Sequence, residues 1–260
     1  MKQAAAAIIS NGEIMPGVYL IWLNSPQIAA TTQPGQFVMV HCGEETLLRR
    51  PLSIHQLADE TGGAKLALLF TVIGKGTQWL SQRKVGDNLD LLGPLGNGYA
   101  IHSSSRNLLL LAGGIGIAPL CFLSQKMVTQ GYSVRLLLGA STASQLYPGH
   151  LLPPETELVT TTEDGTAGKK GMITDFLPDF IDWADQVFAC GPTRMYRTMA
   201  SQNLKTKPVQ ISLEVRMGCG LGTCYGCTLK TKSGLKQVCT DGPVFDLDDI
   251  LWDELDLAEV

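Results

Sequence analysis

The stretch NLLLLAGGIGIAP (residues 107–119) joins an apolar run to a loop of three glycines. A glycine loop between a buried strand and a helix lets the backbone approach a pyrophosphate, and the helix N-terminus supplies N–H donors. Pro119 suits a first helical turn, where its missing N–H has no partner to lose. The match to G-x-G-x-x-G is imperfect because Pro119 replaces the last glycine, so the loop alone leaves a plain tight turn open.

The residues after Arg106 alternate apolar runs with helix-length amphipathic stretches. The further runs are SVRLLLGA (from Ser133), ELVTTT (from Glu157) and QVFAC (from Gln186). This βαβ pattern predicts a parallel sheet. A second turn, ACGP (residues 189–192), ends the last of these runs. Ligands bind at the carboxyl ends of parallel strands, so the two loops together favour a nucleotide site.

The residues before about His102 form short alternating or apolar runs separated by turn residues, which is typical of an antiparallel barrel or sandwich. The strand-like runs are GVYLIWL, GQFVMVHC, RPLSIHQL, AKLALLFTVI and NLDLLG. RRPLS (residues 49–53) offers Arg50 as a bidentate phosphate clamp and Ser53 as a partner for a ring nitrogen. IGKGT (residues 73–77) precedes a helix-like stretch, TQWLSQR (residues 77–83), and suits a pyrophosphate. A solvated Arg50 and a simple hairpin turn at the glycines remain equally open.

Composition narrows the classes of function. The chain has 260 residues, of which 45% are hydrophobic and 17% charged, with a net charge of −4 and a pI near 5.6. These values argue against a nucleic-acid footprint or a polybasic membrane surface. Because no run is long enough for a signal peptide or a membrane span, we expect a cytoplasmic protein. In that compartment seven cysteines indicate metal binding or catalysis rather than disulfides.

Four of the cysteines lie in and after MGCGLGTCYGC (residues 217–227). Cys219, Cys224 and Cys227 have the spacing C-x4-C-x2-C, and Cys239 follows after eleven residues. This is the plant-type [2Fe–2S] spacing, and the glycines beside the ligands let the backbone turn its N–H groups toward the sulfurs. The alternative is a structural zinc with four thiolates, although zinc ribbons favour two C-x2-C pairs. The other three cysteines are expected to be buried hydrophobic residues, and one of them, Cys190, borders the predicted nucleotide site.

The motifs occur in the order RPLS, GKGT, LGPLGNG (residues 92–98), AGGIGIAP, CGP and CGLGTCYGC. In this order the chain resembles the electron-transfer subunits of bacterial type B dihydroorotate dehydrogenases, within the ferredoxin–NADP reductase superfamily. The resemblance covers essentially the whole chain. It implies an antiparallel β-barrel FAD domain (residues 1–102), an α/β parallel-sheet NAD-binding domain (residues 103–213) and a small C-terminal [2Fe–2S] lobe (residues 214–260).

The resemblance also implies which residues hold each group. The residues implied for FAD are Arg50, Pro51, Leu52, Ser53, Leu69, Phe70, Thr71, Gly76 and Thr77. Those implied for the pyridine nucleotide are Gly113, Gly114, Gly116, Gly191 and Pro192, and those for the cluster are Cys219, Cys224, Cys227 and Cys239. NAD(H) is expected rather than NADP(H), because STASQLY (residues 141–147) contains no basic residue to bind a 2′-phosphate. Lys169 and Lys170 lie in a later loop, which could fold over the nucleotide site and supply such a residue.

The function implied is the transfer of electrons from dihydroorotate oxidation to NAD+ in pyrimidine (UMP) biosynthesis. The partner implied is an FMN-containing (β/α)8-barrel catalytic subunit, in a heterotetramer with two copies of each chain. The implied route runs from FMN through the cluster and FAD to NAD+, because a flavin can accept single electrons and deliver a hydride. No acid/base residue is expected in this chain, and His41, His55, His102 and His150 are scattered.

Two alternatives stay open at the level of sequence. One is a related iron–sulfur flavoprotein subunit of the sulfide dehydrogenase or ferredoxin:NADP reductase type, which shares nearly all of these motifs. The other is a non-catalytic module with a structural zinc and a degenerate nucleotide fold.

Overall fold

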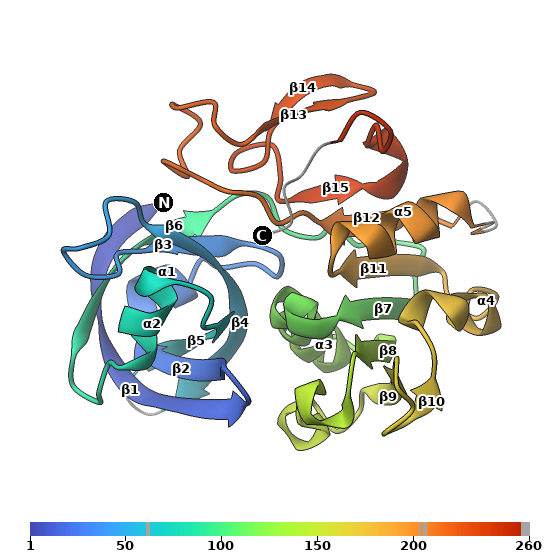
Figure 1. Cartoon of the computed structure of the whole chain (residues 1–260), viewed down its shortest axis with the longest axis horizontal. Helices are drawn as coiled ribbons and strands as arrows, with labels where there is room; N and C mark the ends of the chain where they lie inside the picture. Colours follow the sequence, from blue (N-terminus) through green and yellow to red (C-terminus); the bar gives the residue numbers. More distant parts are fainter. Residues whose placement is uncertain (61–62, 203, 205–206, 256–260) are drawn as a thin grey trace.

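A computed structural model describes residues 1–60, 63–202, 204 and 207–255. Figure 1 shows a β-barrel beside a largely parallel sheet, with a small lobe lying above both. The barrel encloses one hydrophobic cluster, and two further clusters join residues of the barrel to residues of the sheet. The helix α3 (Ile117–Thr129) packs between the two larger parts, against the barrel and against the sheet. No helix in the described ranges has the length and apolar character that crossing a bilayer requires.

The barrel consists of six antiparallel strands that close in the order β1-β2-β5-β4-β3-β6. Their bounds are Lys2–Met15 (β1), Val18–Asn24 (β2), Phe37–Val40 (β3), Arg50–Glu60 (β4), Gly63–Thr71 (β5) and Asn88–Leu95 (β6). In β6 every second residue is buried, because successive side chains of a strand point to opposite faces. This confirms the predicted barrel, but β1 itself was not among the predicted strands.

Two short helices accompany the barrel. They are α1 (Pro26–Ala29) and α2 (Lys75–Ser81). The sequence placed a helix at residues 77–83, so the observed helix begins two residues earlier, directly at the glycine turn. Gly74 is its N-cap residue, with an extended backbone.

The sheet has seven strands in the order β10-β9-β8-β7-β11-β12-β15. Their bounds are Asn107–Gly113 (β7), Ser133–Ala140 (β8), Glu157–Thr162 (β9), Lys169–Lys170 (β10), Gln186–Cys190 (β11), Val209–Ser212 (β12) and Val244–Asp246 (β15). The first six pair in parallel, which confirms the predicted parallel sheet. The edge strand β15 is antiparallel to β12.

The helices between these strands are fewer than the pattern predicted. Besides α3, the described helices are α4 (Leu177–Phe180) and α5 (Thr193–Ser201). Between β8 and β9 only the 3₁₀ turns η2 (Ala143–Gln145) and η3 (Gly149–Leu151) are present. The segment YPGHLLPPE (residues 147–155) contains three prolines, and proline cannot be accommodated inside a helix without loss of a hydrogen bond.

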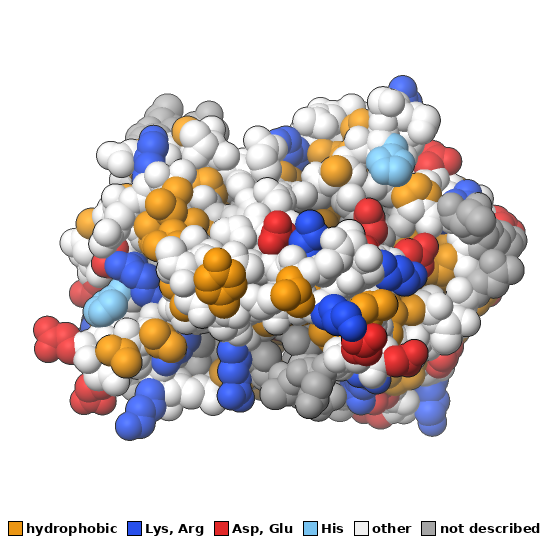
Figure 2. Space-filling model, turned by 90° about the horizontal axis from the view of Figure 1, so that it is seen from above, with side chains coloured by type: hydrophobic (Ala, Val, Ile, Leu, Met, Phe, Trp, Pro, Cys, Tyr) orange, Lys and Arg blue, Asp and Glu red, His pale blue; other side chains and the backbone are white. Residues whose placement is uncertain are grey.

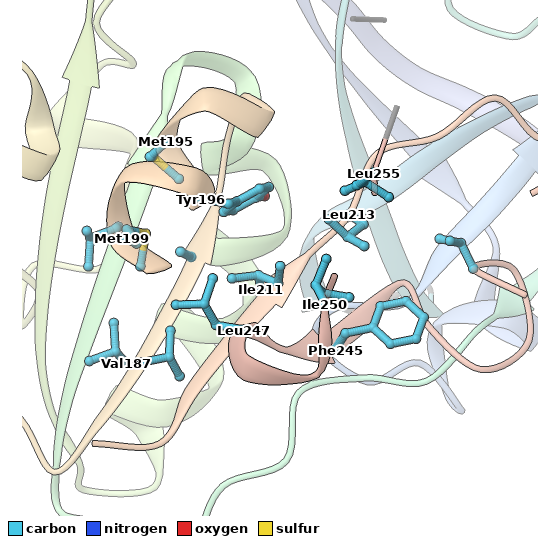
Figure 3. Packing of buried hydrophobic residues seen from close by; sticks show 14 of the residues in the cluster. Val187, Met195, Tyr196, Met199, Ile211, Leu213, Phe245, Leu247, Ile250 and Leu255 are labelled. Atoms are coloured by element: carbon cyan, nitrogen blue, oxygen red, sulfur yellow. The ribbon is translucent and has the colours of Figure 1, made fainter. Parts of the chain in front are cut away.

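The lobe contains the hairpin of β13 (Thr228–Thr231) and β14 (Gly234–Gln237). The chain then returns through β15 and the 3₁₀ turn η5 (Leu247–Asp249). Figure 3 shows Leu247 and Ile250 beside Ile211 of β12, and all three are at most 2% exposed. The apolar residues of the segment after β15 therefore pack on the chain's own body, and the lobe shares one core with the sheet and with part of the barrel.

Candidate functional site

A cavity of about 620 Å³ opens between the barrel, α3 and the segment after β12. Arg50, Pro51, Leu52 and Ser53 of β4 line it, with Leu69, Phe70 and Thr71 of β5 and Thr77 of α2. Eight of the nine residues implied for FAD thus surround one space. The ninth, Gly76, lies directly behind Arg50.

Gly76 leaves room that Arg50 occupies. A Cβ atom at residue 76 would lie 2.8 Å from Arg50 Nε, which is closer than real side chains approach. The guanidinium therefore rests against the first turn of α2, at the wall of the cavity. Arg50 donates to the carbonyl of Leu48, and no carboxylate of the described residues pairs with it. A half-buried cation without a counter-charge in a cavity fits the diphosphate of a dinucleotide.

Thr77 stabilises the turn before α2 through its own hydroxyl. Thr77 Oγ1 accepts hydrogen bonds from the backbone N–H groups of Ile73 (3.0 Å) and Gly74 (3.3 Å). The hydroxyl is therefore used within the turn, and Thr77 shapes the cavity wall there.

A second cavity, of about 470 Å³, lies at the carboxyl ends of the parallel strands. Gly113, Gly114 and Pro192 line it, as expected for a pyridine nucleotide site. Gly116 and Gly191 lie just behind. A Cβ at Gly116 would come within 2.0 Å of the Cys190 carbonyl oxygen, so this glycine allows the close packing of the helix start on β11 that brings the loop to the cavity.

Thr71 and Ile115 line both cavities, so the two spaces meet at these residues. Glu214 lines the larger cavity and had no role in the sequence prediction. Its carboxylate is accessible from the open cavity while protein surrounds it on other sides, and this burial raises the pKa of the carboxyl. A lone acid after a strand has no spacing signal that sequence alone reveals.

The four cysteines of the lobe lie near one another. Cys219 lies beside Cys224, and Cys239 lies beside Cys227 and near Cys219. The two irons of a [2Fe–2S] cluster divide four thiolates between them, and this set of four thiols supplies those ligands.

Backbone N–H groups point at the sulfurs, as the sequence predicted. Leu221 donates its N–H to Cys219 Sγ (3.3 Å), and Gly222 donates to Cys239 Sγ (3.2 Å). Gly222 has a φ of +78°, a conformation that favours glycine. Burial raises the pKa of the Cys219 thiol, but hydrogen bonds from Thr223 and the loop backbone outweigh it and lower that pKa to about 6. The thiolate is the form that binds metal.

Asn97, in the LGPLGNG motif, anchors the lobe to the barrel. Its side-chain amide donates to the carbonyls of Thr240 (3.1 Å) and Asp241 (3.0 Å), and its backbone N–H donates to Gly242 (2.6 Å). These residues directly follow Cys239. Asn97 therefore positions the fourth cysteine, a role that the sequence prediction missed.

The remaining cysteines are buried, as expected. Cys42, Cys121 and Cys190 are each at most 1% exposed and belong to the hydrophobic clusters. Burial raises the pKa of the Cys42 thiol to about 11 and that of Cys121 to about 12. Neutral, enclosed thiols of this kind pack as small hydrophobic groups.

Two family models match parts of the chain. Residues 214–251 match the iron–sulfur cluster binding domain of dihydroorotate dehydrogenase B, and residues 15–99 match the oxidoreductase FAD-binding domain. The chain is also similar over nearly its full length to proteins named dihydroorotate dehydrogenase B (NAD(+)), electron transfer subunit. The one from Desulforamulus reducens is 38% identical over 95% of this chain and 98% of its own, and the one from Caldanaerobacter subterraneus is 36% identical over 95% and 98%.

Solved structures support the fold. The structure of an NADH-dependent reduced ferredoxin-NADP oxidoreductase is 31% identical, with a TM-score of 0.85 over 97% of this chain and 91% of that one. A ferredoxin NADP+ reductase from Neisseria gonorrhoeae, with bound FAD and NADP, is 19% identical, with a TM-score of 0.65 over 80% and 93%. The second likeness concerns the fold alone.

Proposed function

The chain belongs to the family of dihydroorotate dehydrogenase B electron transfer subunits, and we propose that it passes the electrons of dihydroorotate oxidation to NAD+ in pyrimidine biosynthesis. It is an oxidoreductase component that binds FAD and an iron–sulfur cluster, and it acts with a catalytic subunit. The cytoplasmic location stays a prediction from sequence.

Each cofactor has its own residues in this proposal. Arg50 and the turn through Gly76 and Thr77 hold the diphosphate of FAD, and the ends of β4 and β5 hold its ring. The glycine loop at Gly113–Gly116 and the turn at Gly191 and Pro192 receive NAD+. When bound, the cluster passes single electrons and the flavin exchanges both single electrons and a hydride, so the flavin must lie between the cluster and the nicotinamide.

The arrangement of the parts supports this order. The cavity assigned to FAD shares Thr71 and Ile115 with the cavity assigned to NAD+, so a flavin ring and a nicotinamide can meet there. The lobe also contacts the barrel. A Cβ at Gly220 in the cysteine loop would lie 2.7 Å from Met39 of β3, so that loop packs directly on the barrel. The observation that best supports the proposal is that the lobe packs on the barrel and that the cavity of the barrel meets the cavity of the sheet. We propose domain bounds of 1–102, 103–213 and 214–260.

The outer surface of the lobe suits a partner. Cys224 is exposed, and Leu221 (40% exposed) and Tyr225 (70%) lie near it in sequence. Figure 2 looks down on this side of the molecule, where apolar side chains lie among charged ones. We propose that the partner here is an FMN-containing (β/α)8-barrel catalytic subunit and that two copies of each chain assemble.

A reconstitution assay tests the proposal. The holoprotein, with flavin and cluster verified by its visible spectrum, is mixed with the catalytic subunit of the same organism, dihydroorotate and NAD+. Orotate and NADH are expected only in the mixture, while the isolated chain reduces an artificial dye with NADH. Orotate formation by the isolated chain would contradict the subunit assignment.

A competing function is that of a ferredoxin-linked NADP oxidoreductase subunit. The 31% identity to a solved structure of that kind makes it the second candidate. The same assay separates the two. Reduction of NADP+ by reduced ferredoxin, with no response to dihydroorotate and the catalytic subunit, would favour the competing function.

A further inference from the structure

A carboxylate lies at the mouth of the cavity assigned to the pyridine nucleotide. Glu163 directly follows β9, and Glu163 Oε1 accepts a hydrogen bond from Ser141 Oγ (3.2 Å) and lies 3.4 Å from Arg194 Nη2. All three side chains line the cavity. Neither Glu163 nor Arg194 was among the predicted site residues.

The position of Glu163 follows from strand register. In nucleotide-binding parallel sheets, an acid near the end of the second strand binds the ribose 2′-hydroxyl of NAD, and an arginine there accommodates the 2′-phosphate of NADP. Here the second strand, β8, is followed by Ser141, which is neither. Ala140 of β8 pairs with Thr162 of β9 in parallel, so Ser141 and Glu163 emerge side by side at the same sheet edge. The neighbouring strand thus supplies the acid that β8 lacks.

Few cations are available at this cavity. Lys169 lies over the ring of Phe176 at 4.8 Å and within 3.5 Å of the Asp179 carboxylate, and Lys170 packs at Gly165. Neither lysine lines the cavity. Among the described lining residues Arg194 is therefore the one cation, and Glu163 pairs with it.

One further acid, Asp175, lines the cavity, and its Oδ2 accepts the backbone N–H of Met172 (2.9 Å) in a capping turn. Glu163 differs in its neighbours, because it lies beside Ser141 at the end of the second strand and pairs with the lining cation Arg194. Both of these residues contact Oε1. A carboxylate has two oxygens with about four acceptor sites, so Oε2 remains for a ligand hydroxyl within the described surroundings.

We propose that Glu163 is the residue that selects NAD(H) over NADP(H). Its carboxylate accepts a ribose hydroxyl of NAD, repels a 2′-phosphate, and keeps Arg194 from pairing with that phosphate. This inference rests on the proposed pyridine nucleotide site and adds the residue that sets its specificity.

Removing the charge of Glu163 tests the inference. Glu163→Gln preserves the shape of the side chain, removes the repulsion and frees Arg194 for a 2′-phosphate. In the oxidised holoprotein, titration calorimetry should show NADP+ binding at least tenfold tighter than in the wild type. The double variant Glu163→Gln/Arg194→Ala should lose most of that gain, because the freed guanidinium produces it.

Glu157→Gln is the matched control. It removes the same charge at the other end of β9, where Glu157 pairs with Arg135 at 2.7 Å. Its ratio of NAD+ to NADP+ affinity should equal that of the wild type. An unchanged ratio in Glu163→Gln, with normal flavin content, would overturn this inference alone. A wild-type chain that binds neither nucleotide would instead overturn the proposed function.

Discussion

Arg50 and Gly76 form a single contact that two distant motifs of the sequence supply. Because the guanidinium has no carboxylate partner among the described residues, its charge is available to a diphosphate. We expect Arg50→Ala to weaken FAD binding about ten- to a hundredfold, since a hydrogen bond to a charged group contributes about 1.5–3 kcal/mol. The measurement is the flavin dissociation constant of the purified variant.

Arg83→Ala is the control for that measurement. Arg83 follows α2, lies over the Trp79 ring and pairs with Asp87, so its loss removes an equal charge outside the cavity. Equal flavin affinity in the two variants would show that Arg50 does not hold the diphosphate.

The cysteines give a second prediction at this scale. Replacement of Cys219, Cys224, Cys227 or Cys239 by Ser should remove or destabilise the cluster, because a serine oxygen is a harder and poorer ligand than a thiolate. Iron and acid-labile sulfide per chain are the quantities to measure. Cys121→Ala, on the buried face of α3, should keep the full content. Normal iron after Cys239→Ser would mean that the fourth ligand is assigned wrongly.

The sequence alone predicted some of these residues and missed others. The cysteines were predictable because thiolate ligands have a characteristic spacing within one segment. Glu163 and Asn97 were not, because their roles depend on contacts between distant segments. Ser141 and Glu163 meet only after β8 and β9 pair, and Asn97 meets Asp241 only after the lobe folds onto the barrel.

At the scale of elements, the strands were predicted better than their order in space. The buried run of β7 and the alternation of β6 are direct consequences of their surroundings, so their patterns are visible in the sequence. β1 was missed because its run of alanines resembles a short apolar leader. β15 was missed because a strand of three residues at a sheet edge is too short to show a pattern. Its pairing with β12 also depends on the packing of the following residues, Leu247 and Ile250, in the same core.

The position of β15 alters what a truncation will do. Removal of everything from Val215 onward deletes the cluster loop together with β15, Leu247 and Ile250, which complete the core against β12. Each such buried residue contributes roughly 1.5–3 kcal/mol, and a whole domain is stable by only about 5–15 kcal/mol. We therefore expect the truncated chain to aggregate or to lose FAD.

A loop excision provides the comparison. If residues 218–241 are replaced by a short Gly-Ser turn, the cavity lining through Met217, the pairing of Ser212 with Val244 and the hydrogen bond from Leu213 to Pro243 can persist. This variant should keep FAD and NADH-to-dye activity but lose coupled orotate formation. Full coupled activity without the cysteine loop would show that electrons have another path.

At the scale of the whole molecule, one buried histidine links the barrel to α3 and to the loop after β8. His55 of β4 is fully buried, and its Nδ1–H donates to the carbonyl of Ala118 in α3 (2.9 Å). Its Nε2 accepts a hydrogen bond from the Tyr147 hydroxyl at the same distance. The neutral ring is thus satisfied on both sides, and a second proton on Nε2 would break the bond from Tyr147.

This link makes stability depend on pH. Burial lowers the pKa of His55 to about 4, although the bond to Ala118 acts in the opposite direction. The unfolded chain, with a histidine pKa near 6.5, binds the proton first, so its stabilisation relative to the folded state grows as pH falls from about 6.5 to 4. The contribution of His55 to stability is therefore intact above pH 6.5, and about 2 kcal/mol of it is lost by pH 5.

His55→Gln isolates this effect, because glutamine does not titrate. The variant should be less stable than the wild type at pH 7, where it loses a ring that fits both partners, but the difference in Tm should shrink as the pH falls to 5. His150→Gln, which removes an exposed histidine, should follow the wild-type curve at every pH. Release of flavin and cluster at low pH lowers the Tm of every variant alike. The difference in Tm between two variants at the same pH is therefore free of this effect. If the His55→Gln and wild-type curves run parallel from pH 7 to 5, the histidine is not held neutral between the two halves, and the acid sensitivity of the molecule arises elsewhere.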